Sequence, residues 1–400
     1  MTGLRANSSI DLVEMSRSTE VAASIARRDV LGIVGLLLGL AMVGMAIPAF
    51  IPQKEPVGTL VKVGTGSLRE KYSSSGNIPG VSVWSVHGKR LGHAVGTKKR
   101  VYNGSPVDIL VKHYHELGQP LAEYISITNG GIDAICVAYI GMKWNNDVYG
   151  WIGDVGGICG ADWYYTDTVL KSKGGTPTAQ FNPKCIWIDR DRSSGFRTQG
   201  ISMHITDFDV SGEGRKMQYA KYPETMCSRP RFHAYEYMKT EDDIYIFDPP
   251  LEYGPGLVDK DIRKVLVGGK LTEDGRRPYR ARRNDDYYRM PRSRPISRRQ
   301  QKLRSQFKRE VLVVSGSPYH KAEELCQSRT SVGPDFVSLS DNLFCDMEHR
   351  EVWPFSNNGT ATHGCFDVEE RTMKGGAIGA RDSISGRAIP RKSYRTVTNW

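Results

Sequence analysis

The stretch YISITNGGIDAICVAYI, residues 124–140, decides the fold class. Tyr124–Thr128 alternates apolar and polar side chains, as a half-buried strand does, and Ala134–Ile140 is a compact apolar run. Between them, Asn129-Gly130-Gly131 tolerates the positive φ that a tight turn needs. The stretch therefore predicts a strand, a turn and a second strand.

Similar short runs continue toward the C-terminus, separated by turns rich in Gly, Pro and Ser. The predicted strands are Trp163–Leu170, Cys185–Asp189, Gly200–Val210, Phe232–Met238 and Ile244–Phe247. No long amphipathic helix interrupts them. The pattern predicts a mainly β fold, an antiparallel sandwich or barrel-like domain over residues 119–270, rather than a parallel α/β fold.

An uncharged apolar run, VLGIVGLLLGLAMVGMAIPAFIPQ, covers residues 30–53 and is long enough to cross a bilayer. We predict one transmembrane helix over residues 30–52, which would make the lipid bilayer a partner. A cleaved signal peptide ending near Gly44-Met45-Ala46 is the alternative, and it would make the protein secreted. The GxxxG spacing of Gly35 and Gly39 is compatible with a homodimer contact in lipid.

The segments flanking this run are polar. Residues 1–29 predict a disordered cytosolic tail, and residues 53–118, with many Gly and Ser, predict a stalk with irregular strands. The basic residues on the two sides of the run are balanced, so charge does not orient it.

The cysteines orient the chain instead, because all seven follow the apolar run and none has the CxxC spacing of a metal site. They are Cys136, Cys159, Cys185, Cys227, Cys326, Cys345 and Cys365. The glycosylation sequons at Asn103 and Asn358 lie on the same side. We therefore expect an extracellular or lumenal region with two disulfides before the basic segment, one after it and one thiol left over; the partners stay open.

A basic segment accounts for the net charge of +11. Arg276–Arg309 holds fourteen basic and two acidic residues, which leaves 41 basic and 42 acidic residues elsewhere. Residues 271–309 predict a disordered basic linker, either a solvated tether or a substrate for a secretory-pathway protease at Arg282 and Arg283. An extracellular location argues against nucleic acid as its partner.

Order resumes after the basic linker. Residues 310–370 predict a small Cys-bearing α+β module, with a strand at Glu310–Val314 and a short helix from Ser317-Pro318 through Gln327. Residues 371–400, rich in Gly, Ser and Arg, predict a disordered tail.

Two loops place oxygen ligands at alternate positions before a glycine, as calcium loops do. Asp189, Asp191 and Ser193 form the better candidate, and Asp207 and Asp209 form the other. Neither loop has the bidentate Glu of such a site, and Asp and Ser also start ordinary turns. Calcium is the one cofactor that the residues suggest.

No catalytic motif is present, and we assign no catalytic residue. Ser315 follows a predicted strand but lacks the G-x-S-x-G order of a nucleophile elbow. His204 with Asp207 or Asp209, and His233 with Glu236, are the pairs that acid/base chemistry would use. Lone histidines in strands are more often structural.

Aromatic residues are dense around the predicted strands: Trp144, Tyr149, Trp151, Trp163, Tyr164, Tyr165 and Trp187. A glycan-binding face uses such rings, and so does an ordinary core. We favour the core.

Two blocks, ISITNGGIDAICVAYIGMKW (125–144) through GDVGGICGADWYY (153–165), and SVGPDFVSLSDNLFCDMEHREVWPF (331–355) followed by GCFD (364–367), resemble secreted or membrane-anchored proteins of filamentous fungi that have no assigned activity. The resemblance covers about half of the chain and implies no catalytic residue. With the cysteines, it leads us to expect a binding or structural interaction module at the cell surface or wall, with a wall glycan or surface protein as partner. A secreted hydrolase with an Asp/His site is the alternative.

Overall fold

The computed structural model describes residues 45–46, 58–68, 74–114, 120–172, 180–209, 219, 223–227, 229–238, 244–251, 265–267, 310–356, 364–375, 381–382 and 386–400. Among the described residues 47% lie in strands and 9% in helices, so this part of the chain is mainly β, as the sequence predicts. None of the helices within these ranges has the length and apolar character needed to cross a bilayer. The predicted transmembrane helix over 30–52 lies outside the described residues except for Met45–Ala46, which form the short strand β1 instead.

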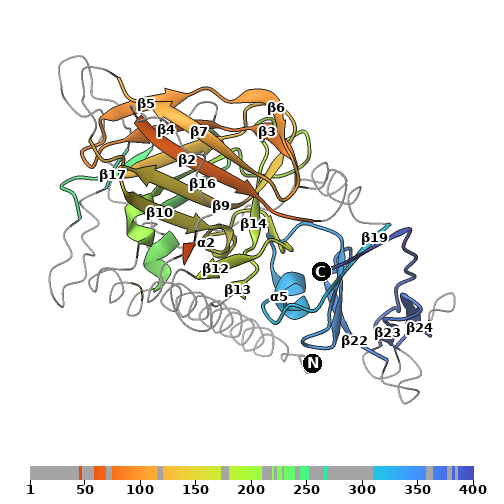
Figure 1. Cartoon of the computed structure of the whole chain (residues 1–400). Helices are drawn as coiled ribbons and strands as arrows, with labels where there is room; N and C mark the ends of the chain where they lie inside the picture. The colour runs from red at the N-terminus through yellow and green to blue at the C-terminus, as the bar shows by residue number, and fades with distance from the viewer. Residues whose placement is uncertain are drawn as a thin grey trace, which may run out of the picture.

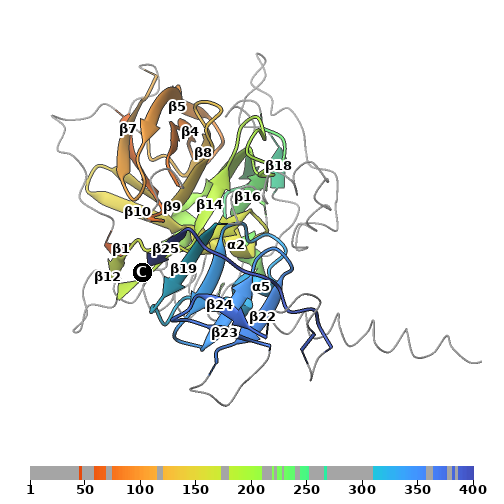
Figure 2. The ribbon, with the colours of Figure 1, turned by 90° about the vertical axis from the view of Figure 1, so that its right-hand side faces the viewer.

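Two antiparallel sheets form the first part of the molecule (Figures 1 and 2). One has the strand order β11 (Trp163–Tyr164), β14 (Cys185–Ile188), β9 (Ile135–Trp144), β2 (Gly58–Thr65) and β7 (Pro106–Lys112), with β10 (Asp147–Ile152) also paired to β9. The other has the order β16 (Phe232–Tyr235), β15 (Gly200–His204), β8 (Tyr124–Thr128), β4 (Gly80–Trp84) and β5 (Arg90–Ala94).

Apolar side chains from the two sheets share one core. Alternate residues of each strand contribute to it, for example Val61 and Val63 of β2, and Ile125 and Ile127 of β8. A bridge between Gly92 and His113 links the edges of the two sheets, but the described strands do not close into a barrel.

The predicted strands at 124–140 are present, but they are not partners. β8 lies in one sheet and β9 in the other, so the turn between them carries the chain across the core. Gly130 and Gly131 make the crossing possible: a Cβ on Gly130 would lie 2.0 Å from the carbonyl oxygen of Ile78, and one on Gly131 would lie 2.2 Å from Oδ1 of Asn77.

Smaller elements complete this part. Three short sheets pair β3 (Gly76–Ile78) with β6 (Thr97–Val101), β17 (Tyr245–Phe247) with β18 (Val265–Val267), and β12 (Leu170–Ser172) with both β13 (Gln180–Phe181) and β1. The helical segments are α2 (Gly153–Ile158), η2 (Ile205–Phe208) and η3 (Pro223–Cys227).

Residues 53–118, predicted to be a stalk, differ most from expectation, because their described part supplies six strands from β2 to β7. β2 lies between β7 and β9, and β4 lies between β5 and β8. The glycines here serve close packing rather than flexibility: a Cβ on Gly76 would lie 2.6 Å from the carbonyl oxygen of Ala134.

The C-terminal part is a mixed sheet with one helix packed on it. Its strand order is β22 (Glu351–Pro354), β21 (Leu343–Asp346), β20 (Asp335–Ser338), β19 (Val311–Ser315) and β25 (Thr396–Asn399). β19 runs parallel to β20 and to β25, and α5 (Ala322–Gln327) connects β19 to β20. A separate hairpin pairs β23 (Cys365–Asp367) with β24 (Thr372–Lys374).

Two expectations for this part need correction. The helix begins at Ala322 with Lys321 as its N-cap, later than the predicted Ser317-Pro318 start. The predicted disordered tail over residues 371–400 supplies two strands: β24, which pairs with β23, and β25, which adds to the edge of the sheet.

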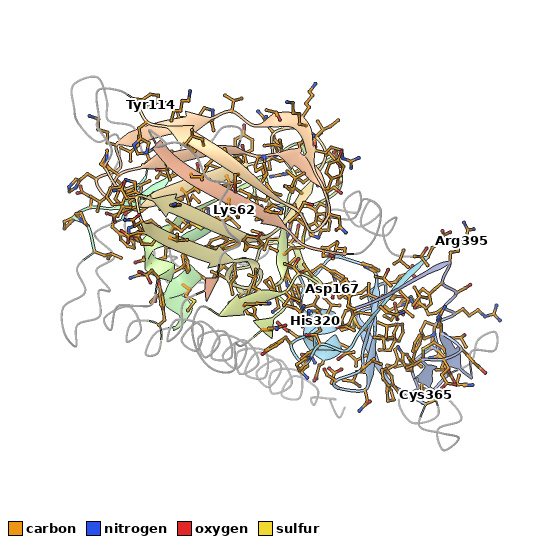
Figure 3. The ribbon with its side chains drawn as sticks, in the orientation of Figure 1. Lys62, Tyr114, Asp167, His320, Cys365 and Arg395 are labelled. Atoms are coloured by element: carbon orange, nitrogen blue, oxygen red, sulfur yellow. A yellow bond between two sulfur atoms is a disulfide. The ribbon has the colours of Figure 1, made fainter. Side chains whose placement is uncertain are left out.

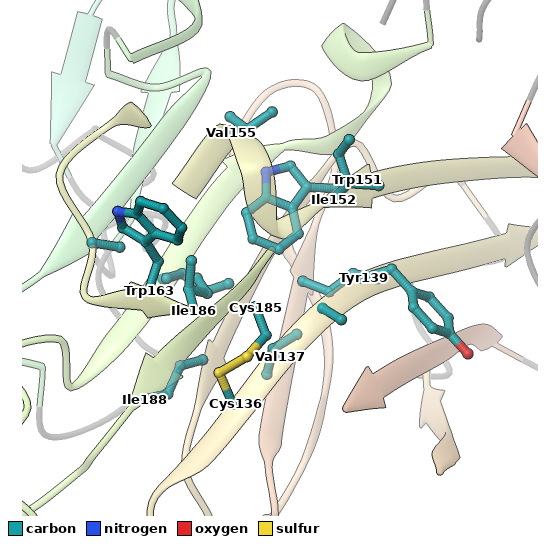
Figure 4. Close-up of a cluster of buried hydrophobic side chains, with 14 of the residues drawn as sticks. Cys136, Val137, Tyr139, Trp151, Ile152, Val155, Trp163, Cys185, Ile186 and Ile188 are labelled. Carbon is teal, nitrogen blue, oxygen red and sulfur yellow. A yellow bond between two sulfur atoms is a disulfide. The ribbon is translucent and has the colours of Figure 1, made fainter. Parts of the chain in front are cut away.

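Three disulfides confirm that cysteine pairing braces both parts. They join Cys136 to Cys185, Cys159 to Cys227, and Cys326 to Cys345. The first links β9 to β14 inside the core (Figure 4). Buried Cys365 is outside these pairs. Disulfides of this kind are typical of proteins that fold outside the reducing cytosol.

Candidate functional site

His204 ends strand β15, and its imidazole is buried between two carboxylates. Nε2 lies 3.0 Å from Oε2 of Glu123, and Nδ1 lies 3.1 Å from Oδ2 of Asp207. Burial disfavours the charged imidazole, but the carboxylates of Asp207 and Glu123 outweigh burial and raise the pKa of His204 to about 9. Since a protonated imidazole cannot accept a proton, His204 is a cation in a buried ion cluster rather than a general base.

The other predicted histidine, His233, has a different environment. Its ring packs edge-on against Tyr235 and Tyr245, with centroids 4.3 and 5.3 Å away, and Nε of Arg229 donates to its Nδ1 over 3.3 Å. Burial and the guanidinium of Arg229 hold the pKa of His233 well below its usual range. His233 therefore packs as a neutral ring.

Asp189 does not join His204 in one pocket. Its amide donates to the carbonyl of Thr198 over 2.8 Å. Thr198 lies two residues before the start of β15, and His204 is at the other end of that strand. At roughly 3.3 Å per residue the two side chains are about 20 Å apart. Asp189 is therefore not part of the His204 and Asp207 cluster, which an Asp/His hydrolase site would use.

The candidate calcium loop is a turn held by its own carboxylates. Oδ2 of Asp189 accepts the amides of Ser194 and Phe196, at 2.9 and 3.4 Å, and Oδ1 of Asp191 accepts the amide of Ser193 at 3.0 Å. Burial and the neighbouring Asp191 carboxylate raise the pKa of Asp189 to about 7. Within the described ranges, no group of three or more His, Cys, Asp or Glu side chains has metal-binding geometry.

Replacing Asp189 with Asn is expected to remove a pH dependence of stability. The folded protein keeps the Asp189 proton up to about pH 7, whereas the unfolded chain releases it near pH 3.9. The free energy of unfolding should therefore fall by about 2–4 kcal/mol between those pH values. Asn keeps the acceptor and cannot ionise, so the fall measured by urea unfolding at pH 4.5 and pH 8 should be about 2–4 kcal/mol smaller in the variant than in the wild type. His204, whose pKa is also raised on folding, contributes to the fall in both proteins. An equal fall in both proteins would contradict this assignment.

Five of the seven aromatic residues belong to the core. Trp151, Trp163, Tyr164, Tyr165 and Trp187 are buried, and Figure 4 shows Trp151 and Trp163 above the Cys136–Cys185 disulfide. Trp144 and Tyr149 are half-buried. The packing interpretation therefore accounts for most of the aromatic density.

The predicted Ser315 position is also internal. Its Oγ lies 2.7 Å from Nδ1 of His320, and both residues are fully buried. Figure 3 shows His320 where the C-terminal part meets the sandwich. Burial and the ammonium of Lys184 lower the pKa of His320 to about 3. The pair holds the loop between β19 and α5, because Ser315 Oγ also accepts the amide of Ser317.

Of the modification sites, only Asn103 lies in the described residues. It is half-buried, and its Oδ1 accepts hydrogen bonds from the amide of Leu68, at 3.0 Å, and from the Ser74 hydroxyl. Asn358, Arg282 and Arg283 lie outside the described residues, as do Gly35 and Gly39.

The C-terminal part contains a buried ion cluster that the sequence does not predict. Nζ of Lys392 lies 3.0 Å from Oδ2 of Asp335 and 2.6 Å from Oδ1 of Asp346, and all three side chains are buried. Nδ1 of His349 lies 2.7 Å from Oδ2 of Asp346, and the hydroxyl of Tyr394 donates to Asp335 over 2.7 Å. The three charged residues at its centre, Asp335, Asp346 and Lys392, are far apart in sequence, so no local motif reveals the cluster.

A second feature that sequence reasoning missed is a loop end of the sandwich, formed by residues 95–100, 129–133 and 189–195. Contacts join the three loops. Gly96 packs on Gly130, because a Cβ on Gly96 would lie 2.5 Å from the Cα of Gly130. Ser193 Oγ donates to the carbonyl of Ile132 over 3.1 Å. In Figure 1, β3 and β6 mark this end at the right, and β17 lies at the left.

The loop end exposes two aliphatic side chains beside basic ones. Val95 is 75% exposed and Ile132 is 69% exposed. The basic residues of the three loops are Lys98, Lys99, Arg100, Arg190 and Arg192, against Asp133, Asp189 and Asp191. Arg100 pairs with Asp133 at 2.9 Å. This end of the sandwich is therefore both apolar and cationic.

Comparison with known proteins adds little. No protein family model matches the chain, and no curated protein sequence matches it. One similar solved structure is "Crystal structure of Delta413-417:GS LOX", which is 12% identical over 31% of this chain and 16% of that chain. Its TM-score of 0.18 is too low to show a common fold.

Proposed function

We propose that the chain is an extracellular interaction module that binds a component of the cell envelope through the loop end. The exposed Val95 and Ile132 support this proposal most directly, because aliphatic side chains gain free energy when a partner covers them. The three disulfides support an extracellular site of action. The apolar run 30–52 would hold the module at the membrane, or its removal would release the module.

The titratable clusters support binding over hydrolysis. His204 is protonated and buried, and His233 and His320 are neutral and packed against aromatic rings. Their hydrogen bonds and ion pairs join elements of the fold. Such clusters stabilise a scaffold, whereas catalysis needs a group that can exchange protons with a substrate.

A hydrolase remains the second candidate because of one pair, Asp346 and His349. The buried carboxylate of Asp346 contacts Nδ1 of His349, whose side chain is 55% exposed, and this is how an orienting acid holds a catalytic histidine. A His349→Ala variant with unchanged envelope binding would separate the two functions.

Envelope binding is expected to depend on the loop end. In sedimentation with isolated envelopes of a filamentous fungus, Val95→Asp/Ile132→Asp should weaken apparent affinity at least about tenfold, because two charges replace the apolar contact. The matched control is Val148→Asp/Val169→Asp, which alters two other exposed aliphatic residues. Val148 follows the far end of β9, about 30 Å from the loop end.

All three proteins carry the same apolar run 30–52, so a difference between them reports the loop end alone. Equal sedimentation of the loop-end variant and the wild type would refute the proposal. So would an equal loss in the control.

A further inference from the structure

We infer that the partner of the loop end is an anionic lipid surface, with Val95 and Ile132 entering the headgroup region and basic side chains contacting the lipid phosphates and carboxylates. This inference rests on the proposed function and names its partner. The loop end is formed by three loops that are distant in sequence, and none of them contains a lipid-binding motif of its own.

The apolar side chains of the loop end are aliphatic, which favours lipid over glycan. Val95 and Ile132 carry no hydrogen-bonding group, and they are the most exposed aliphatic side chains of the described residues. Glycan sites use aromatic rings with polar groups beside them, whereas insertion into a lipid interface uses apolar side chains with basic residues around them. The loop end has the second combination.

The charge of the loop end also favours an anionic lipid surface. Lys98 and Lys99 are exposed on β6 directly after the Val95 turn, and Arg190 is exposed on the loop that Ser193 ties to Ile132. Asp133 is compensated by Arg100. Basic residues close to an anionic bilayer each strengthen binding, and the effect weakens with salt.

The backbone of the loop end is supported by buried side chains. Asn77 accepts the amide of Asp133 over 2.9 Å and donates through Nδ2 to the carbonyl of Lys98 over 2.9 Å, so one buried side chain fastens two of the loops. Asn129 donates to the carbonyl of Ile188, next to the third loop, over 3.3 Å. The exposed side chains are therefore presented by a preorganised frame, which lowers the entropic cost of binding.

A local fluorophore tests the inference on the full chain. Ile132→Cys is labelled with an environment-sensitive dye, Val148→Cys is the control position, and wild type treated identically is the blank for buried Cys365. With vesicles of phosphatidylcholine containing about 30% phosphatidylserine, we expect at least about a twofold rise in emission at position 132 and none at 148. High salt, or the substitutions Lys98→Glu/Lys99→Glu, should reduce this rise in emission at position 132 at least about tenfold. The local readout excludes the contribution of the apolar run 30–52.

Two results would overturn the inference. An equal response to pure phosphatidylcholine vesicles would show that charge has no part in it. A response to polygalacturonate without one to the anionic vesicles would identify an acidic glycan as the partner. In that second case the envelope sedimentation would still depend on Val95 and Ile132. The proposed interaction module would then be retained, and the anionic lipid partner would be rejected.

Discussion

Replacing Lys392 with Met is expected to lower the free energy of unfolding by about 3–5 kcal/mol. The ammonium group lies between the carboxylates of Asp335 and Asp346, and its side chain is only 8% exposed. Without it, two buried carboxylates would face each other in a medium that solvates charge poorly. The variant should recover part of its loss at pH 4, because protonation of the carboxylates removes the repulsion.

The matched control is Lys374→Met. Lys374 also contacts two acids, Asp367 at 3.0 Å and Glu370 at 2.9 Å, but its side chain is 35% exposed. Solvent screens exposed pairs and they contribute little to stability, so urea unfolding should separate the variants clearly. Hydrogen exchange should also speed up in β25 of the Lys392 variant, because Lys392 fastens the segment leading to that strand. Similar losses in the two variants would show that burial does not set the strength of the Lys392 cluster.

The fold class and the number of disulfides were predictable because both depend on local sequence features. The runs predicted as strands, Cys185–Asp189 and Gly200–Val210, have the composition of strands. Strands form over Cys185–Ile188 and Gly200–His204, while Ile205–Phe208 forms η2. The number of cysteines and their positions predict two disulfides before the basic linker and one after it. The structure has these three disulfides. The identity of the partners needs the fold.

Strand partners were not predictable in the same way. The turn at Asn129-Gly130-Gly131 is compatible with a hairpin. However, β8 is buried throughout and β9 is buried from residue 135 to residue 142, so each strand has a neighbour on both sides. β8 finds them in β4 and β15, while β9 finds them in β2, β10 and β14. Sheet pairing is non-local, and composition does not encode it.

The ordered structure of the C-terminal segment and the exposure of the loop end could not be predicted from the sequence either, because both depend on non-local contacts. The segment 386–400 is polar by composition, and its position depends on Lys392, Tyr394 and the parallel pairing of β25. Val95 and Ile132 look like ordinary strand-flanking residues until the three loops are placed together. The candidate site therefore came almost entirely from the structure.

Trp163 connects the two parts that the sequence separates with a basic linker. Its amide donates to the carbonyl of Thr330 over 3.1 Å, and its carbonyl accepts the amide of Val332 over 2.7 Å. The indole Nε1 donates to Ser328 Oγ over 3.0 Å, and Nζ of Lys184 lies 4.4 Å from the ring centroid. Lys184 in turn pairs with Glu324 of α5. Buried residues of both parts belong to one hydrophobic cluster, so we expect them to unfold together.

Replacing Trp163 with Ala should therefore destabilise both parts at once, by about 3–5 kcal/mol, because it opens a cavity at their boundary. Native-state hydrogen exchange measures this directly: protection should fall by the same factor in β9 and β14 of the sandwich and in β19–β21 of the C-terminal part. Trp144→Ala, at the half-buried end of β9, is the control and should cost about 1 kcal/mol or less. If protection fell in β19–β21 alone, the two parts would be separate cooperative units that merely touch, and the division into two modules predicted from the sequence would hold energetically.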